Sequence, residues 1–356
     1  SYHIQNISKL MRVRIISEIQ EFLDCKDKWD TIFNKHDYSF FQSFEFNYYS
    51  WINELSKNKL NRLCIISLKN NGIVFAILPL YIDSKRRLRF INDVHADFCD
   101  VLSEQKFEFE TILSEIRDKF KFHSVHFINC KKDSFLYKLF IANQLKNSLL
   151  MPHAKYSDIA ISAGNFPSNM IRYKSKQKTE FRRVKKKNLG KDHYILQKYD
   201  DSDFPINEIY KLRERIIKLR LRKDNFLDED RLLLLEKLYN SNRILISLVK
   251  TKGNTHAISF ISRNKNNYLF WIDMYDNSKM INIFNYISFI ENVSLNDRVN
   301  INFGRGVYDY KLQNFKPDIK QLFSIHIFQN KFKLNLFLVI ERIINFLKLI
   351  YKIFLK

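Results

Sequence analysis

Two hairpin-like stretches, 180 or 181 residues apart, constrain the fold of this chain more than any other feature. Residues 63–82 read as an apolar run, a turn and a second apolar run, and residues 244–262 repeat that arrangement. An Ile-Ser-Leu triplet precedes each turn, at 66–68 and 246–248, and a glycine lies in each turn, at Gly72 and Gly253. Each stretch is predicted to form a β-hairpin.

The order of elements after each hairpin is also shared. A helix is predicted at 107–121 with a strand at 124–130, and a helix at 281–295 with a strand at 298–304. The parallel order favours an internal duplication of one α/β unit, and the alternative is chance similarity between common motifs. A length of 356 residues suits two domains of this kind.

The charge balance predicts an anionic partner. Lys and Arg number 60 against 38 Asp and Glu, a formal charge of +22. Nucleic acid, membrane and nucleotide cofactors all fit that charge. The stretch 172–187 carries nine basic residues and one acid, Glu180, with apolar residues at helical spacing. It is either a binding face or a solvated helix face.

Other features concern the compartment. The four cysteines are widely spaced and lack metal-ligand patterns, so we expect reduced, mostly buried thiols. The first residues lack the pattern of a secretory signal, so a cytoplasmic location is expected. No segment has the ~18 consecutive apolar residues of a membrane span.

The nine histidines form no i, i+4 pair, and no metal site is expected.

The tail, 331–356, is apolar except for a polar line along one predicted helix face, at Glu341, Asn345, Lys348, Lys352 and Lys356. Such a basic amphipathic helix can lie in the interface of an anionic membrane, on the inner face of the cytoplasmic membrane. Docking on the protein's own surface or in a dimer is the alternative. The oligomeric state stays open.

The most specific signal is the series at 268–315. It comprises a strand, YLFWIDMYD, a helix, a strand that ends in Gly-Arg-Gly, and then Tyr-Lys with an aromatic residue beyond. This series resembles the GNAT-type acetyltransferases of the CelD/BcsL group, which is associated with polysaccharide and cellulose biosynthesis and is related in fold to the FemAB peptidyltransferases. The matching positions are Trp271, Asp273, Tyr275, Asp276, Phe303, Gly304, Arg305, Gly306, Tyr310 and Lys311.

The first half also fits the resemblance, through Phe41-Gln42-Ser43, Leu78 to Leu80 and the stretch from Asp97 to Asp100. The resemblance implies an α/β (α+β) fold of tandem GNAT-like domains, each with a mixed central sheet flanked by helices. Residues 1–155 would be a degenerate, acceptor-side domain, 160–330 the acyltransferase domain and 331–356 the amphipathic helix.

The resemblance also implies a cofactor site. In GNAT enzymes two neighbouring parallel strands splay apart and pair with the pantetheine arm of acyl-CoA; here these would be 268–276 and 299–306. Acetyl-CoA or another acyl-CoA is therefore the expected co-substrate. Its pyrophosphate would lie at the N-terminus of the helix that begins near Ile281. The residues expected to bind it are Trp271, Tyr275, Ser278, Lys279, Gly304, Arg305 and Gly306. The chain departs from the family pattern in having no glycine at 277–280.

Catalytic candidates follow from the chemistry of acyl transfer to an amine. Asp273 is the preferred base, because an aromatic surround raises the pKa of a carboxyl group. Tyr310 would return a proton to the departing thiolate, and Lys311 or Arg305 would pair with phosphate or a developing oxyanion. Asp276 points to the opposite strand face from Asp273.

Asp97, Asp100 and Asp276 are candidate substrate-binding acids, suited to a cationic amino sugar or amino acid. Capping a turn is the structural alternative for the first two. The leading prediction is thus an acyl-CoA-dependent N-acyltransferase that acts on an amino sugar or similar amine of surface polysaccharide. The alternatives are a FemAB-like enzyme that uses aminoacyl-tRNA, and a non-catalytic basic protein that binds membrane or nucleic acid.

Overall fold

The computed structural model describes residues 11–143 and 145–354, which form two compact units. The first unit comprises Ser1–Lys35, Asn58–His153 and Leu322–Lys356, and the second comprises His36–Lys57 and Ala154–Gln321. Each has a mixed sheet flanked by helices, as predicted. The units differ from the contiguous ranges 1–155 and 160–330 in two main respects: residues 36–57, from early in the chain, pack with the second half, and residues 322–330 belong to the first unit.

The first unit contains a four-stranded sheet, in the order β1-β3-β4-β7, and part of a larger sheet, in the order β15-β8-β6-β5-β2. Its strands are β1 (Met11–Ile16), β2 (Arg62–Leu63), β3 (Ile65–Asn70), β4 (Ile73–Leu78), β5 (Leu80–Ile82), β6 (Arg87–Phe90), β7 (Leu102–Ser103) and β8 (Ser124–Lys131). Its helices are α2 (Ile19–Asp24), α3 (Lys26–Lys35), α5 (Phe109–Lys119), α6 (Phe135–Asn143) and α12 (Lys331–Phe354). The chain passes between the units in β9 (Ser148–Ile161) and β15 (Asp318–Phe328).

The second unit is built on the strand order β10-β11-β12-β13-β14-β9. Its other strands are β10 (Asp192–Leu196), β11 (Ile244–Thr251), β12 (Asn254–Asn264), β13 (Asn267–Tyr275) and β14 (Val299–Arg305). Its helices are α4 (Phe44–Asn53), α7 (Ser175–Lys187), α8 (Ile206–Lys218), α9 (Glu229–Asn240), α10 (Ile281–Val293) and α11 (Asp309–Phe315). Three short 3-10 turns, η1 (Phe40–Gln42), η2 (Leu55–Lys57) and η3 (Lys198–Asp200), complete it.

The two predicted hairpins are β3–β4 and β11–β12, and their registers are related by an offset of 181. Leu68 pairs with Ala76 and Val249 with Ala257, and each hairpin has a bulge just after that pair. The glycines and alanines of the sequence match are therefore structurally equivalent. The Ile-Ser-Leu triplets are 180 apart, so they are out of register by one residue and their side chains lie on opposite sheet faces.

Both hairpins lead into a parallel strand pair joined through a helix. In the first unit β6 pairs with β8 across α5, and in the second β13 pairs with β14 across α10. Pro79 separates β4 from β5, because proline cannot donate to a strand ladder. The long strand β12 has a bulge between Phe260 and Ile261 at the equivalent position. This shared order supports the predicted duplication.

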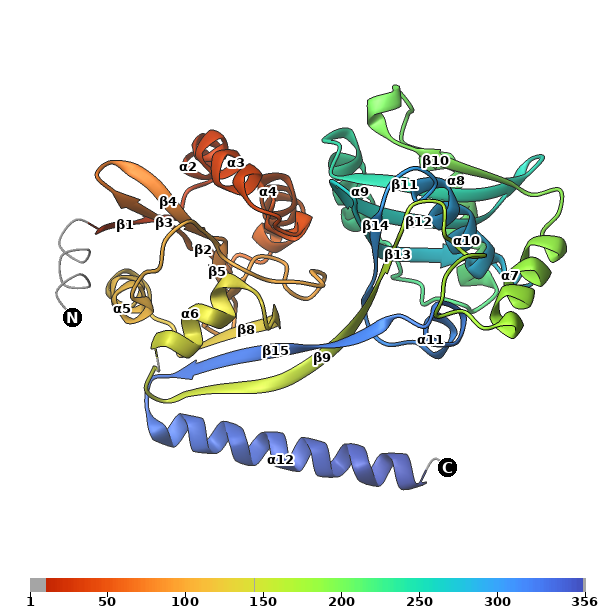
Figure 1. Cartoon of the computed structure of the whole chain (residues 1–356). Coiled ribbons are helices and arrows are strands. Elements are labelled where there is room, and N and C mark those ends of the chain that lie inside the picture. Colours follow the sequence, from red (N-terminus) through yellow and green to blue (C-terminus); the bar gives the residue numbers. More distant parts are fainter. Residues whose placement is uncertain (1–10, 144, 355–356) are drawn as a thin grey trace. The chain divides into compact units, whose positions relative to one another are not determined.

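Helices cover both faces of the second unit's sheet (Figure 1). One apolar core joins α7 and α10 to the sheet, through Phe181, Val184, Ile287 and Phe289 among others. On β11 and β12 the residues Ile246, Leu248, Ile258 and Phe260 are also buried but lie outside that core. Strand side chains alternate between faces, so these residues serve the opposite face, where α8 and α9 contact the sheet.

Candidate functional site

Strands β13 and β14 separate part-way along their length. They run parallel and pair only from Asn267–Leu269 to Asn300–Asn302. Beyond that point β13 continues to Tyr275 beside β12, and β14 continues to Arg305. From Phe270 and Phe303 onward, the two strands therefore do not form the regular backbone hydrogen bonds of a parallel pair. This is the splay that the family resemblance implied, in the strands for which it was expected.

Two glycines bend the chain where β14 ends. Gly304 has φ 76° and Gly306 has φ 97°, values in the left-handed region that side chains disfavour. A Cβ atom on Gly306 would also lie 2.9 Å from the ring of Tyr308. The Gly306 N–H donates to the Lys155 carbonyl at 2.8 Å, which ties the bend to β9. The bend leads into α11, which carries Tyr310 and Lys311.

The Lys311 side chain is buried and turns back toward the separated strands. Its Nζ donates to the carbonyl oxygen of Phe303 at 2.7 Å and lies 3.8 Å from Oδ2 of Asp273. The rings of Tyr286, Tyr308 and Tyr310 lie within 5.8 Å of the ammonium group. A buried ammonium requires such partners, because desolvation of an isolated charge is costly. The structure thus brings Asp273, Tyr310 and Lys311 together.

Asp273 ends a chain of buried hydrogen bonds. Ser259 on β12 donates to Oδ1 at 2.7 Å, and the Tyr286 hydroxyl of α10 donates to Oδ2. Asn285 donates to Ser259 at 3.0 Å. Each of these hydrogen bonds is donated in the direction of Asp273, as an ionised carboxylate requires because it can only accept. The Asp273 carboxylate is therefore held in one orientation by the sheet and by α10.

The chain of hydrogen bonds continues across the sheet to its edge. Ser247 on β11 donates to Oδ1 of Asn285 at 2.7 Å, and Nε2 of His193 on β10 lies 2.8 Å from the Ser247 hydroxyl. Because that hydroxyl already donates to Asn285, it accepts from His193. Burial lowers the pKa of His193 to about 4, so the imidazole is neutral at physiological pH. Ser247 and Asn285 are almost fully buried.

The two tyrosines beside Asp273 stay protonated at neutral pH. Burial, and then the charge of Asp273, raise the pKa of Tyr310 far above its usual value. The same two causes raise the pKa of Tyr286. Each phenol is therefore a proton donor and not a base in this site. That protonation state suits the role predicted for Tyr310.

Asp276 is engaged in the turn between β13 and α10. Its Oδ2 accepts from Arg215 at 2.9 Å and lies 2.8 Å from Nδ1 of His256, while Oδ1 accepts from the Ser278 N–H at 2.9 Å. Burial acts to raise the pKa of Asp276, but the hydrogen bonds from Ser278 and His256 outweigh it and hold the pKa below its usual value. These contacts fix the turn, and they are partners that a substrate ammonium would have to displace.

The start of α10 is surrounded by basic residues. Its capping residue, Met280, has φ 59° and provides no side-chain cap. Arg183 of α7 lies 3.7 Å from the sulfur of Met280, and the Lys187 and Lys279 side chains lie close enough that desolvation and then the charge of Lys279 lower the pKa of Lys187. The predicted pyrophosphate ligand Ser278 instead contacts His256, 3.3 Å away. An anion here would meet free N–H groups and three cations.

The other predicted cofactor residues of the second unit lie nearby on the same strands. The Trp271 ring packs on Phe40, Phe41 and Phe46, with ring centroids 5.1 to 5.9 Å apart. Tyr275 faces the guanidinium of Arg222, 5.9 Å from its ring. Arg305 is paired with Tyr156 of β9. The aromatic neighbours of Asp273 are therefore Tyr286 and Tyr310, whereas Trp271 belongs to a separate cluster.

Asp97 and Asp100 belong to the first unit, where Asp97 is buried and Asp100 is half-buried. Asp100 accepts hydrogen bonds from the backbone N–H groups of Val101, Phe135 and Leu136, at 2.8 to 2.9 Å. Burial raises its pKa to about 6, against the opposing effect of those hydrogen bonds. Asp100 therefore caps α6, which is the structural alternative given above for these acids.

Ser259, Asn285 and Tyr286 are among the residues of the site that were not identified from the sequence. Asn285 and Tyr286 are polar groups in the middle of the otherwise apolar helix INIFNYISFIENV. That contrast was the available signal, because a buried polar group needs a polar partner. Ser259 gave no signal, since its partners come from α10 and β13.

Among the described residues, no cluster of three or more His, Cys, Asp or Glu side chains could hold a metal ion. All four cysteines are buried and unpaired with one another, as expected. No helix in the described part of the chain is both long enough and apolar enough to cross a membrane.

Comparison with solved structures shows the fold. The C-terminal domain of a protein named as a lysylphosphatidylglycerol synthetase from Agrobacterium fabrum matches with a TM-score of 0.56 and 10% identity, over 89% of this chain and 95% of that one. The L-PGS of Bacillus licheniformis matches with a TM-score of 0.56 and 13% identity, over 90% and 96%. FemX matches with a TM-score of 0.56 and 10% identity, over 91% and 99%.

No family model and no curated protein sequence matches the chain. The assignment to the CelD/BcsL group therefore stays a prediction. The likeness to FemX accords with the part of the resemblance that linked the fold to the FemAB peptidyltransferases.

Proposed function

We propose that the chain is a transferase that moves an acyl or aminoacyl group from an activated donor to an amine, with the chemistry in the second unit. The observation that carries this proposal is the convergence of Asp273, Tyr310 and Lys311 where β13 and β14 separate. A base, a protonated phenol and a cation are the three groups that acyl transfer to an amine requires.

Each group has one role in the proposed reaction. Asp273 accepts the proton that the attacking ammonium must lose, and the amine nitrogen then forms a bond to the donor carbonyl carbon. Lys311 stabilises the negative charge on the carbonyl oxygen. As the bond to the leaving group breaks, Tyr310 protonates that group and regains a proton from the nitrogen of the new amide, which loses its second proton. Tyr286 and Ser259 position the Asp273 carboxylate through their hydrogen bonds.

Acyl-CoA is the first candidate donor. The separated edges of β13 and β14 offer backbone groups that suit the amides of a pantetheine arm, and the basic start of α10 suits its pyrophosphate. The acceptor of this version is an amino sugar or a related amine, with surface polysaccharide as the expected context.

Aminoacyl-tRNA is the second candidate donor, and several observations favour it. The Phe303 carbonyl on the β14 edge already accepts from Lys311, and the turn before α10 contains a buried carboxylate and no glycine. Helix α7 also presents exposed basic residues beside that turn, which suit a phosphate backbone. The names of the similar structures, a lysylphosphatidylglycerol synthetase and FemX, agree with aminoacyl transfer.

The experiment that tests the proposal measures transfer to an amine from acetyl-CoA, from a longer acyl-CoA and from aminoacyl-tRNA. Asp273→Asn and Lys311→Ala should each lower turnover about 10²- to 10⁴-fold. Lys252→Ala, at an exposed hairpin turn, is the matched control and should retain turnover. Full activity of both site variants would contradict the site assignment, even if the transferase activity itself were present.

Two measurements separate the donors. Saturable binding of acetyl-CoA by calorimetry at moderate salt supports acyl-CoA. Loss of transfer on treatment with RNase, and a steep decrease in activity with added salt, supports aminoacyl-tRNA. Absence of transfer and of binding with all three donors would favour the non-catalytic alternative.

A further inference from the structure

Helix α12 of the first unit exposes a long apolar face. It has 24 residues, which gives a length of about 36 Å. Nine large apolar residues on it are exposed, and by helical geometry they all fall within an arc of roughly 160°. They are Phe332, Leu336, Val339, Ile340, Ile343, Ile344, Phe346, Leu347 and Tyr351. A continuous apolar face of this size indicates an interaction surface.

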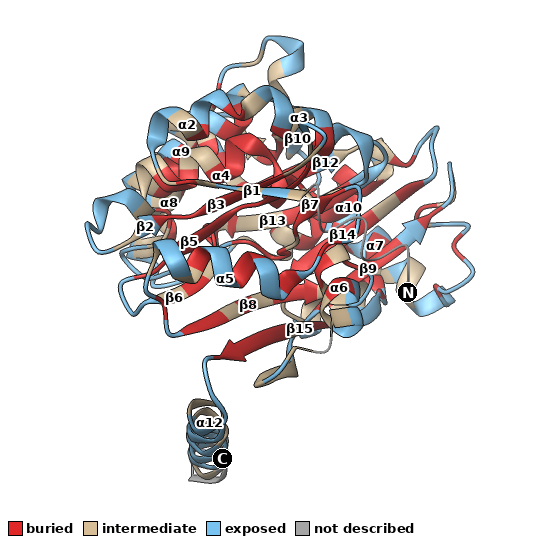
Figure 2. Ribbon diagram, turned by 90° about the vertical axis from the view of Figure 1, so that its left-hand side faces the viewer, coloured by how far each residue is buried: buried red, intermediate tan, exposed pale blue. Residues whose placement is uncertain are grey.

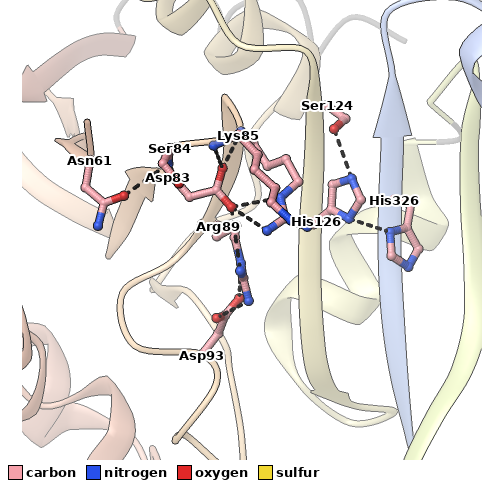
Figure 3. Close-up of polar contacts among 10 residues, drawn as sticks. Asn61, Asp83, Ser84, Lys85, Arg89, Asp93, Ser124, His126 and His326 are labelled. Carbon is pink, nitrogen blue, oxygen red and sulfur yellow. Dashed lines mark hydrogen bonds and ion pairs between the residues drawn. The ribbon is translucent and has the colours of Figure 1, made fainter. Parts of the chain in front are cut away.

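Only the beginning of α12 is seated on the sheet of the first unit. Phe337 packs on the ring of His326 at 4.8 Å and on Phe328 at 5.2 Å. His126 and His326 lie side by side on neighbouring strands (Figure 3). Burial lowers the pKa of His126 to about 3 and that of His326 to about 4, so both imidazoles beside α12 are uncharged at neutral pH. The rest of the helix is largely exposed (Figure 2).

The opposite face of α12 is basic. Lys331, Arg342 and Lys348 are exposed there, and the tail 331–356 contains six basic residues and one acid, Glu341. Lys333 lies on the apolar side in the first turn, where a long lysine stem can reach out of an apolar layer. Lys356 is outside the described residues. An apolar face beside a basic face is the pattern of a helix that lies in the plane of a membrane interface.

A basic pocket lies elsewhere on the same unit. It has a volume of about 360 Å³, and its polar lining includes one acid, Asp83, which is already paired with Arg87. Its five basic residues are Lys59, Arg62, Arg86, Lys119 and Lys121. Apart from Lys119, these side chains make no hydrogen bond or ion pair with any residue that the structure describes. Cations left without protein partners in a concave surface suit phosphate.

The basic pocket and the start of α12 lie at the same end of one sheet. Phe328, just before α12, is paired with Ser124 at the start of β8, and Ser124 is paired with Arg87 at the start of β6. Leu88 is paired with Ile82, which is paired with Arg62. The pocket residues Arg62, Arg86 and Lys121 therefore border the sheet end at which α12 begins.

We propose that the first unit binds the surface of an anionic membrane, with the apolar face of α12 in the interface and lipid phosphates in the basic pocket. Charge selects this partner over a second copy of the chain. Two copies that each carry +22 repel each other, whereas an anionic lipid surface attracts the same charges.

The test is co-sedimentation of the full chain with vesicles of phosphatidylcholine that contain either about 30% phosphatidylglycerol or none. The chain should bind the anionic vesicles and lose binding as salt is added. Equal binding to the neutral vesicles, or binding to neither, would overturn the proposal.

A matched pair of variants tests the apolar face. Ile343→Glu with Leu347→Glu places two acids on the apolar side, and Asn335→Glu with Asn345→Glu places two acids on the polar side. Both pairs add two negative charges, so the electrostatic loss of affinity should be the same. The first pair also removes apolar contact with the membrane, so it should bind anionic vesicles more weakly than the second pair by a factor on the order of a hundred. Equal losses would show that α12 does not insert. Conversion of a dimer to a monomer by the first pair, without vesicle binding, would assign the face to self-association instead.

A second pair tests the basic pocket. Lys59→Gln with Lys121→Gln removes two pocket cations, and Lys211→Gln with Lys252→Gln removes two exposed lysines of the second unit. The pocket variant should bind anionic vesicles about thirtyfold more weakly than wild type, because each of the two basic residues near the surface contributes about a fivefold factor in affinity. Equal effects of the two variants would exclude the pocket from the lipid contact.

Discussion

At the scale of single residues, burial decides which charged groups are available for chemistry. Lys311 is buried, and its ammonium group donates to the Phe303 carbonyl and lies 3.8 Å from the Asp273 carboxylate. Asp276 by contrast accepts from Arg215 and Ser278 and contacts His256. The first arrangement places an ammonium group beside Asp273 where β13 and β14 separate, whereas the second holds a turn.

Asp276→Asn should lower the free energy of unfolding by about 1–3 kcal/mol at neutral pH. The pKa of Asp276 in the folded protein is below its ordinary value of 3.8, so the carboxylate stabilises the fold fully above about pH 4. That contribution is lost as the pH falls through the lower, folded-state pKa. Urea denaturation of wild type and variant at several pH values measures the difference.

The control is Asp309→Asn, which removes an exposed carboxylate that begins α11. A stability difference for Asp276→Asn that stays constant down to the lowest pH would contradict the role given to its charge.

At the scale of elements, the end of β14 shows what sequence motifs predict well. Both glycines of the Gly-Arg-Gly motif have positive φ, which glycine adopts readily, so the bend follows from the motif itself. The direction in which the bend sends α11 was not predictable, because it depends on the contact of Gly306 with Lys155 of β9. Helices α5 and α10 were predicted within a few residues, since their apolar periodicity is a local property.

Gly306→Ala should cost more stability than Gly253→Ala, although both glycines have similar φ values of 97° and 83°. A Cβ on Gly253 meets no atom within 4 Å, so its substitution adds only backbone strain of about 1 kcal/mol. A Cβ on Gly306 also clashes with Tyr308, and we expect about 2–3 kcal/mol. Thermal unfolding of the two variants makes the comparison.

Addition of Tyr308→Ala to the Gly306→Ala variant should recover part of the loss, because it removes the atoms in contact with the new Cβ. Equal losses in the two single variants would show that the Tyr308 contact has no energetic effect.

At the scale of the whole molecule, residues 36–57 are the main departure from a simple tandem order. They come early in the chain but contribute α4 to the second unit, where Glu45 pairs with Arg243 at 2.7 Å. Trp271 packs on three phenylalanines of this segment. The fold and stability of the second unit therefore depend on residues that are separated from the rest of the unit by residues 58–153.

Phe46→Ala should destabilise the second unit by about 3–5 kcal/mol, since it empties a fully buried site beside Trp271. Hydrogen exchange of the β12 and β13 amides should accelerate. Phe22→Ala is the matched control, because Phe22 is equally buried but belongs to the first unit. If both variants accelerated hydrogen exchange only in the first unit, the assignment of residues 36–57 to the second unit would be contradicted.

The sequence by itself determined the properties that are local or additive. Hairpin turns, helix periodicity, the glycine bend, the charge of +22 and the amphipathic tail all follow from neighbouring residues or from counts, and the order of the elements revealed the duplication. Tertiary structure decided which polar groups meet. Asp273 acquires Ser259, Tyr286 and Lys311 as neighbours only when β12, α10 and α11 converge, because those contacts join residues that are distant along the chain.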